Sequence, residues 1–267
     1  MNTLILSQLK TKIMARECVF LGTRRTTIPF FLSNPNSVND GIVACAYFDE
    51  NKSKNHMWKE NRAVGLCSAV VVFNIPIGNI AAFDMICASA AATVLQELTG
   101  AIVKIKWPSD IIIGGRKTGE IRSDYRVTEI TSVIASEIKL YLTDASRYLS
   151  KDSLKVSESI FKQSGHKLSF AEVLEAYYNK LETMYFDFMR NENCMTKQQQ
   201  HLYNSLLLNI GRQVFVDAQD DNGQKSNAHV SVGIAKGIDE IGRLICRTNE
   251  GQETRLENIN THIRGLY

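Results

Sequence analysis

The chain has 267 residues, of which 44% are hydrophobic and 22% charged, so it can bury a sizeable core and its composition argues against intrinsic disorder. The formal net charge of +3 comes without any block of basic residues, which argues against nucleic acid as a partner. The sequence has 6 cysteines and no C-x-x-C pair, a pattern that favours neither a zinc site nor a disulfide scaffold. We therefore predict reduced thiols and no metal site in a cytoplasmic protein.

The apolar stretches and the first residues of the chain bear on membrane spans, a DNA-binding domain and a targeting segment. Each apolar stretch is expected to be too short for a membrane span of roughly 20 residues. The first predicted core strand begins at Cys18, which leaves too little chain before it for a helix-turn-helix domain of roughly 60 residues, so a repressor function is not expected. The first sixteen residues contain Lys10, Lys12 and Arg16 and no acid, a weak match to an organelle transit peptide, and an ordinary leading helix is favoured.

Hydrophobic periodicity predicts an α/β protein. In chain order, the expected strands before residue 210 are 18–21, 42–48, 63–75, 102–106, 111–113 and 129–141. One helix is expected over 81–98, with Asn79 as its N-cap and Gly100 as its stop, and a second over 169–189. After Gly211, short strand-like segments are separated by Gly223, Gly242 and Gly251. We therefore predict a mixed sheet flanked by helices over residues 1–210 and a small β-barrel over 211–267.

The segment from residue 102 to 121 sets a lysine, a Trp-Pro step and an acid between two apolar runs, and the glycine pair at 114–115 reverses the chain, which predicts a hairpin. Pro108 fixes its own φ and pushes Trp107 toward an extended conformation, so Lys106 is held at a strand end, where it suits an anion. The alternative is an edge strand with solvated lysines and Trp107 in the core. As an exposed strand-end residue, Lys106 is expected to contribute within about 0.5 kcal/mol to stability.

The residue sequence of this hairpin resembles a motif of a known family. Lys-Trp-Pro-Ser-Asp at 106–110, followed by Gly-Arg-Lys-Thr-Gly-Glu-Ile at 115–121, looks like the Lys-Trp-Pro-Asn-Asp hairpin of the biotin protein ligases. These enzymes activate biotin with ATP and attach it to a carrier-domain lysine. Residues 232–248 are similar to the small SH3-like barrel that ends these ligases. The resemblance implies the class II synthetase-like biotin/lipoate ligase fold, the substrates biotin and ATP with Mg²⁺, and a biotin carboxyl carrier domain of a carboxylase as partner. A homodimer is compatible with it.

The resemblance also assigns roles to the hairpin side chains. The family's motif lysine contacts biotin and the phosphoryl and carboxyl oxygens of the adenylate, and this role falls here on Lys106 as the candidate catalytic residue. Asp110 is expected to orient Lys106 or to help deprotonate the acceptor lysine. Lys117, across the hairpin turn, is a weaker phosphate candidate, with simple exposure as the alternative. Ser109 stands where the family has Asn.

The family's Gly-Arg-Gly-Arg loop and the tryptophan after it match the loop 49–58. Lys52 and Lys54 stand at the two arginines, Ser53 lies between them, and Trp58 stands at the tryptophan, so these four are expected contacts of biotin or the adenylate. Lysine supplies charge to a phosphate but lacks the bidentate fork of arginine. The alternative interpretation is a solvated mixed-charge loop.

Two further segments match with substitutions. Thr26-Thr27-Ile28 matches the family turn that hydrogen-bonds the biotin ureido ring, so Thr26 and Thr27 are expected ligand contacts. Residues 135–140 align with the Gly-Ile-Gly-Ile-Asn-Val strand that lies against the ligands, and Glu137 stands at the second glycine. A carboxylate there would occupy space where the family strand lets a ligand approach closely. All these residues are expected to bound one pocket over one face of the sheet.

Three functions stay open at this stage. The leading hypothesis is an active biotin protein ligase, because the hairpin and the terminal barrel match in order. A lipoate ligase is disfavoured because no Arg-Arg-x-Ser-Gly-Gly-Gly run occurs and because the Trp of the hairpin favours the biotin branch. The non-enzymatic alternative is a degenerate homologue that binds a ligand or a carrier domain without turnover.

Overall fold

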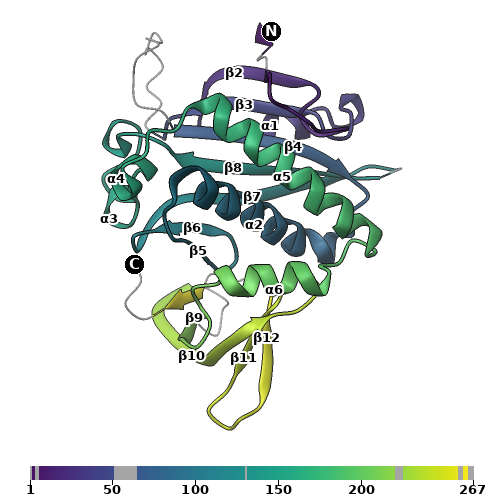
Figure 1. Ribbon diagram of the computed structural model, residues 1–267. Helices are drawn as coiled ribbons and strands as arrows, with labels where there is room; N and C mark the ends of the chain where they lie inside the picture. Colours follow the sequence, from purple (N-terminus) through teal and green to yellow (C-terminus); the bar gives the residue numbers. More distant parts are fainter. Residues whose placement is uncertain are drawn as a thin grey trace.

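The computed structural model of the protein describes residues 2–3, 6–50, 65–129, 131–219, 225–257 and 261–263. Its main element is an eight-stranded sheet in the order β1-β2-β3-β4-β8-β7-β6-β5 (Figure 1). The strands are β1 (Asn2–Thr3), β2 (Cys18–Arg24), β3 (Val43–Phe48), β4 (Gly65–Phe73), β5 (Val103–Lys106), β6 (Asp110–Ile113), β7 (Arg116–Val127) and β8 (Ser132–Tyr141). The β2–β3 pair is parallel and the other neighbouring pairs are antiparallel, so the predicted mixed sheet is confirmed.

Two long helices, α2 (Ile80–Thr99) and α5 (Phe170–Arg190), cover one face of this sheet (Figure 1). The helix α2 ends at Gly100 in the left-handed conformation, as predicted. Asn79 does occupy the N-cap position, but its side chain makes no capping hydrogen bond and donates instead to the Asn193 carbonyl at 2.8 Å. The helix α5 begins with a capping box between Ser169 and Glu172. The small residues of α2 allow both helices to pack closely into the main core.

The helix α2 corrects one sequence expectation. The segment Ile77–Thr99 is long and apolar enough to cross a membrane by length and composition alone, so the prediction that every apolar stretch is too short is wrong here. However, 61% of its most apolar window is buried inside the protein. Such burial is typical of a core helix, because the apolar side chains of α2 pack against the sheet and α5.

Within the described residues, apolar clusters cover the opposite face of the sheet at its two ends. Alternate residues of each strand point to this face, and at one end Val71 and Ala135 pack against the short helix α1 (Ile28–Leu32). At the other end Phe48, Tyr141 and Tyr148 form a second small cluster. The connecting segments contain η1 (Pro35–Ser37), η2 (Ile77–Asn79), η3 (Ala145–Arg147), α3 (Ser153–Val156) and α4 (Ile160–Ser164). The stretch of sheet between the two clusters holds the polar side chains described below.

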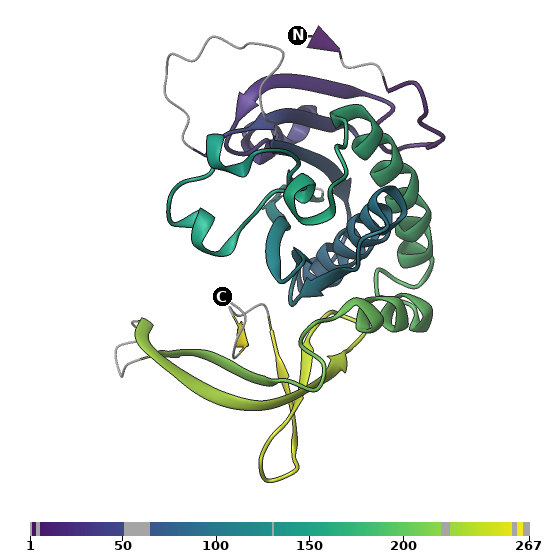
Figure 2. The same ribbon diagram turned by 60° about the vertical axis from the view of Figure 1, so that its left-hand side comes forward.

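The C-terminal part follows α6 (Lys197–Leu206) and forms a five-stranded antiparallel sheet in the order β12-β11-β10-β9-β13 (Figure 2). Its strands are β9 (Gln213–Gln219), β10 (Lys225–Ile238), β11 (Leu244–Arg247), β12 (Glu253–Leu256) and β13 (Thr261–Ile263). Gly242, at φ +90°, seats this sheet on α2, because a Cβ there would lie 2.9 Å from the Ala82 nitrogen. The predicted turns at Gly242 and Gly251 are confirmed by their positive φ, and Gly223 lies outside the described residues.

Several boundaries and elements differ from the sequence predictions. The expected leading helix is absent from residues 6–16, where the backbone N–H groups of Ile13 and Met14 donate to the Glu182 carboxylate on α5 at 2.7 and 2.8 Å. The strand predicted from residue 129 begins at Ser132, because Thr128 and Thr131 close a turn in which the Thr128 N–H donates to the Thr131 carbonyl at 2.8 Å. The helix α6 was not predicted, although Thr196 and Gln199 form a capping box that marks its start. Its apolar residues are few and widely spaced, so its periodicity is weak.

Candidate functional site

The predicted hairpin is confirmed as β5, β6 and the start of β7. Lys106 lies directly opposite Asp110 in the β5–β6 ladder. Trp107 is buried, its backbone N–H donates to Asn209 Oδ1 at 2.8 Å, and the Trp107–Pro108 peptide is cis. The Ser109 hydroxyl donates to the Ile121 carbonyl at 2.9 Å, which fixes the hairpin to β7. Ser109 therefore has a backbone-bracing role in this structure.

The expectation that Lys106 is an exposed strand-end residue is wrong, since its exposed fraction is only 8%. The strand β5 ends the sheet order, but residues after α6 cover it: Leu207 bridges Ile105, and the Leu208 N–H donates to the Ile105 carbonyl at 2.8 Å. Burial lowers the pKa of the Lys106 ammonium, while Asp110 raises it and Lys117 lowers it further. A partly desolvated ammonium interacts strongly with any anion that reaches it.

Lys117 is the centre of an ionic network and not an exposed residue. Its Nζ lies 2.6 Å from an Asp110 oxygen and 2.6 Å from a Glu120 oxygen, and its side chain is 15% exposed. Burial would lower the pKa of Lys117, but Asp110 and Glu120 raise it well above the ordinary value. Asp110, expected to orient Lys106, forms its short ion pair with Lys117. Both hairpin lysines thus lie around one carboxylate.

Glu120 extends this network across the sheet. It lies 3.5 Å from Lys139 Nζ on β8 and 3.5 Å from Arg122 Nε on its own strand. Burial would raise the pKa of Glu120, but Lys117, Arg122 and Lys139 outweigh it and hold the pKa at about 2. Glu120 is therefore ionised and shared by three cations.

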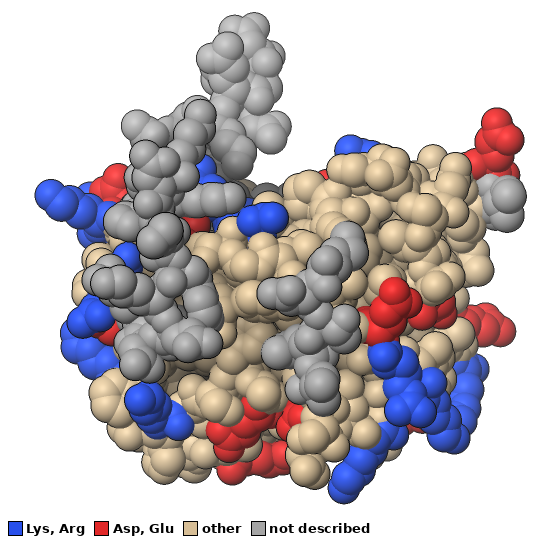
Figure 3. Space-filling view, turned by 90° about the horizontal axis from the view of Figure 1, so that it is seen from above, with Lys and Arg blue, Asp and Glu red and all other residues tan. Residues whose placement is uncertain are grey.

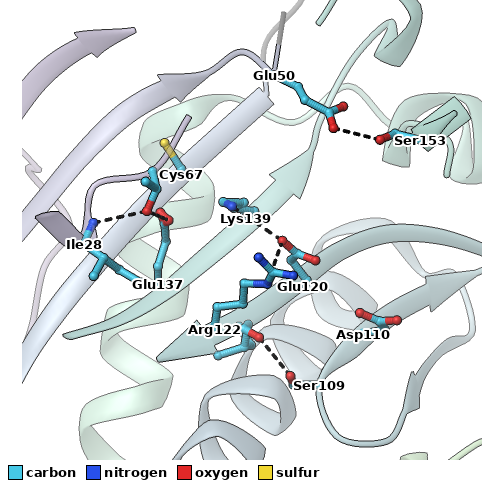
Figure 4. A network of polar contacts seen from close by, with 12 residues as sticks. Ile28, Glu50, Cys67, Ser109, Asp110, Glu120, Arg122, Glu137, Lys139 and Ser153 are labelled. Atoms are coloured by element: carbon cyan, nitrogen blue, oxygen red, sulfur yellow. Dashed lines mark hydrogen bonds and ion pairs between the residues drawn. The ribbon is translucent and has the colours of Figure 1, made fainter. Parts of the chain in front are cut away.

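The turn at Thr26 and Thr27 is held by Glu137. The Thr26 hydroxyl donates to Glu137 Oε1 at 2.7 Å, and the Thr27 N–H donates to Glu137 Oε2 at 2.9 Å. The Ile28 N–H donates in turn to the Thr26 hydroxyl at 3.3 Å (Figure 4). The Thr27 hydroxyl is buried and has no hydrogen-bond partner among the described residues. Of the two hydroxyls that were expected to face a ligand, that of Thr26 is thus engaged by a side chain of the protein.

Register places four charged residues side by side on the sheet. In the β7–β8 ladder Glu120 lies opposite Lys139, and Arg122 lies opposite Glu137. Residues two apart on a strand share a face, so the four form a square in which opposite charges alternate (Figure 4). We call Glu120, Arg122, Glu137 and Lys139 the charged square. Glu137 accepts hydrogen bonds from the Thr26 turn and Glu120 pairs with Lys117 of the hairpin, so the charged square lies between both predicted site segments.

A cavity of about 430 Å³ opens beside the charged square. This volume lies within the range of small-molecule sites. Its lining residues are Arg25, Phe48, Glu50, Lys117, Glu120, Arg122, Lys139, Tyr141, Ser153, Val156 and Ser157. Four of these are cations and two are acids, so the cavity favours a ligand that carries negative charge. The Glu50 carboxylate closes one side by accepting from the Ser153 hydroxyl at 2.9 Å (Figure 4).

Of the predicted site residues that the structure describes, Lys117 lines this cavity, whereas the predicted residues Thr26, Thr27, Lys106 and Asp110 are not among its lining residues. Most of the lining was not predicted. Arg122 and Glu120, like Glu137 and Lys139, are spaced two apart on strands, so alternation was a usable signal for their common face once the register was known. Arg25 and Glu50 gave no such signal, because they come from the ends of β2 and β3. Of the predicted loop residues, Lys52, Ser53, Lys54 and Trp58 lie outside the described residues.

Over the described part of the chain, no three His, Cys, Asp or Glu side chains gather as a metal site would require. All six cysteines are described and are free thiols. In Figure 3, basic and acidic side chains are interspersed with wide uncharged areas on the face that is seen.

The sequence is related to characterised proteins over most of its length. No family model matches the chain. The bifunctional ligase/repressor BirA of Bacillus subtilis is 25% identical to it over 249 residues, which cover 91% of this chain and 73% of BirA. BirA of Bacillus spizizenii gives the same identity and coverage.

Solved structures show the same fold. The biotin protein ligase of Aquifex aeolicus, in complex with biotin and ATP, has a TM-score of 0.69 at 15% identity and covers 93% of this chain and 99% of its own. The biotin protein ligase of Leishmania major, in complex with biotinyl-5-AMP, has a TM-score of 0.52 at 15% identity and covers 91% of this chain and 99% of its own. This chain is thus similar to BirA in sequence over most of its length and has the fold of the solved biotin protein ligases.

Proposed function

We propose that this protein is an ATP-dependent biotin protein ligase that forms biotinyl-AMP and transfers biotin to a lysine of a carboxylase carrier domain. The observation that carries the proposal is the hairpin, in which the buried Lys106 lies opposite Asp110, Asp110 pairs with Lys117, and Lys117 lines a cavity of ligand size. The relation to BirA over 91% of the chain supports it.

The proposed domain division follows the family. Residues 1–210 form the ligase-like catalytic domain, and residues 211–267 form an SH3-like barrel. The five-stranded antiparallel sheet after α6 supports the second assignment. Trp107 links the two parts, because its indole N–H donates to the Gly242 carbonyl at 3.1 Å. The position of the hairpin therefore depends on the C-terminal sheet.

The first chemical step needs no covalent enzyme intermediate. A carboxylate oxygen of biotin attacks the α-phosphorus of ATP, a P–O bond forms, and the bond to the β-phosphate breaks with release of pyrophosphate. Lys106 and Lys117 are proposed to neutralise the charge that gathers on the carboxylate and phosphoryl oxygens. Thr26 and Thr27 are proposed to contact the ureido ring, and Asp110 to hold the two lysines in place.

The second step transfers the acyl group. The acceptor lysine, neutral when it attacks, forms an amide with the biotinyl carbonyl carbon, AMP leaves, and the new amide loses a proton. Lys52, Ser53, Lys54 and Trp58 are proposed to shield the mixed anhydride from water, as the matching family loop does. Mg²⁺ is proposed to enter as the counter-ion of the ATP phosphates, which is its usual mode of binding. Asp110 and Glu120 are already paired with Lys117, so they are not proposed as metal ligands.

The partner follows from the chemistry. We propose a biotin carboxyl carrier domain as acceptor, a cytoplasmic location, and a homodimer as a compatible state. Six free thiols suit a reducing compartment.

One observation favours a second candidate function. Glu137 engages the donors of the Thr26 turn, so a degenerate homologue that binds a carrier domain or another ligand without turnover also fits the geometry. A lipoate ligase is the third candidate and differs in the acid that it activates.

One assay separates the three. Adenylate formation and transfer to a purified carrier domain are measured with biotin and, separately, with lipoate, for the wild type, Lys106→Met and Lys104→Met. Loss of Lys106 removes one preorganised charge and should lower the transfer rate by about a hundredfold or more. Lys104 is the matched control: it lies two residues earlier on β5, and its ammonium donates to the Ser205 carbonyl at 2.9 Å. It should stay close to wild type.

Each outcome points to one candidate. Equal rates for all three proteins would contradict the role of Lys106. Transfer of lipoate but not biotin would indicate a lipoate ligase. No transfer of either acid by the wild type, with a cognate acceptor present, would indicate the degenerate homologue. Circular dichroism and thermal melting of each variant show whether Lys106→Met, which lacks a buried side-chain charge, is still folded.

A further inference from the structure

The Thr26 turn carries an internal carboxylate. Glu137 is 1% exposed, and each of its oxygens accepts one hydrogen bond, from the Thr26 hydroxyl at 2.7 Å and from the Thr27 N–H at 2.9 Å. The two segments are more than a hundred residues apart in sequence, so the fold itself brings this acceptor to these donors. A carboxylate that uses both oxygens blocks both donors for anything else.

The surroundings of Glu137 suggest that another acceptor can replace its carboxylate at the two donors. The two donors to Glu137, the Thr26 hydroxyl and the Thr27 N–H, are uncharged groups. The neighbouring cation Lys139 reaches Glu120 at 3.5 Å. Burial raises the pKa of the Glu137 carboxyl, while Lys139 and the hydrogen bonds from Thr27 and Thr26 lower it. A buried carboxylate held mainly by neutral donors is less firmly fixed than one in a short ion pair, such as Asp110 beside Lys117 at 2.6 Å.

Glu137 also has a polar neighbour toward which its carboxylate can turn. It lies directly opposite Arg122 in the β7–β8 ladder, and the Arg122 side chain is 69% exposed. Opposite residues on one face of an antiparallel pair lie within reach of each other. A rotation of the Glu137 side chain toward Arg122 would free the donors of the turn and keep the carboxylate paired.

We propose that Glu137 is a specificity-determining residue that competes with the acyl substrate for the Thr26 hydroxyl and the Thr27 N–H, so that a head group with a carbonyl acceptor binds only after Glu137 gives up both bonds. This rests on the proposed function in one respect, the use of the Thr26 turn by the head group of the acid. The competition sets the affinity for the acid and leaves the phosphoryl chemistry at the hairpin unchanged.

The test measures equilibrium binding of biotin by calorimetry, and transfer kinetics, for the wild type and Glu137→Gly. Removal of the competitor should lower the dissociation constant and the KM for biotin at least about tenfold, equivalent to about 1.4 kcal/mol, with kcat little changed. The isosteric Glu137→Gln, which keeps one acceptor oxygen, should give an intermediate value and serves if the glycine variant folds poorly. Ser132→Gly, at the far end of β8, is the control for added backbone freedom in the same strand.

A double mutant separates competition from general loosening of the pocket. If biotin uses the donors that Glu137 leaves, Thr26→Val in the Glu137→Gly background should remove most of the gain in affinity. In the wild-type background the same change should have a smaller effect, because the hydroxyl is already engaged.

The outcomes distinguish this inference from the proposed function. If the wild type transfers biotin and Glu137→Gly binds it within twofold of wild type, the inference is overturned and the ligase assignment stands. If the wild type is inactive and Glu137→Gly gains binding that Thr26→Val removes, the inference stands and the ligase assignment fails. If none of the folded variants binds biotin, both are overturned.

Discussion

Replacing Lys117 by Met should destabilise the protein by about 3 kcal/mol or more, because it leaves the Glu120 and Asp110 carboxylates without their shared cation. Lys117 is 15% exposed and lies 2.6 Å from each partner, so solvent screens the pair only weakly. The three cations around Glu120 lower its pKa from 4.5 to about 2. At about 1.4 kcal/mol per pKa unit, that shift corresponds to about 3 kcal/mol of stability.

The same shift fixes the sign of the pH dependence. The folded pKa of Glu120 lies below its unfolded value, so its contribution is complete above pH 4.5 and is lost as the pH falls toward 2. Between pH 7 and pH 3 the wild type should lose about 2 kcal/mol through Glu120 alone. In Lys117→Met this loss should shrink, because the carboxyl is no longer held ionised by its closest cation.

Urea denaturation at pH 7 and pH 3 measures both effects. The control is Lys180→Met, which breaks an exposed ion pair with Glu97 at 3.1 Å and should change stability by no more than about 1 kcal/mol. The double variant Lys117→Met with Glu120→Gln should recover part of the loss, since no carboxylate then stays unpaired at that position. If Lys117→Met is as stable as Lys180→Met at pH 7, the buried network does not stabilise the fold and the reasoning is refuted.

Two further predictions concern the sheet beneath the site. The Asp84 carboxyl on α2 accepts hydrogen bonds from the Ser123 and Ser136 hydroxyls. Burial raises the pKa of Asp84 from 3.8 to about 7 despite these bonds. The free energy of unfolding of the wild type should therefore fall by up to about 4 kcal/mol as the pH rises from 4 to 8. Asp84→Asn should remove most of this dependence in denaturation curves, and an unchanged slope would show that Asp84 is ionised in the fold. A Cβ at Gly119 would lie 2.5 Å from the Lys139 carbonyl oxygen, so Gly119→Ala should cost about 1–3 kcal/mol by separating β7 from β8, and a loss under 0.5 kcal/mol would mean that the strands shift freely.

The hairpin could be predicted from the sequence because its signals are local. The Trp-Pro step, the glycine pair and the alternation of residues 102–106 lie within twenty residues of each other, and the structure has strands where they predict them. The helices α2 and α5 were likewise marked by long apolar periodicity and by terminal residues such as Gly100 and Ser169. Where periodicity was weak, as in α6, the helix was missed.

The burial of Lys106 could not be predicted, because the covering segment comes from residues 207–209, about a hundred positions along the chain. The sequence shows β5 as an edge, and only the tertiary structure shows that Leu207 lies against it. The charged square was missed for a related reason. Its pairs depend on the register of β7 against β8, and a shift by one residue would turn each of these side chains to the other face.

The two faces of the sheet have different roles, one in the core and one at the candidate site. The main core lies between the sheet and the helices α2 and α5, and it contains none of the charged square. The residues of the square lie on the other face, between the two small apolar clusters. Charged side chains at this place do not disturb the packing of the helices, which lie on the opposite face. Because Glu120 is neutralised by three cations and Glu137 accepts two hydrogen bonds, both carboxylates are tolerated inside the protein. The fold is thus fixed by one face of the sheet, while the proposed choice of ligand depends on the polar side chains of the other face.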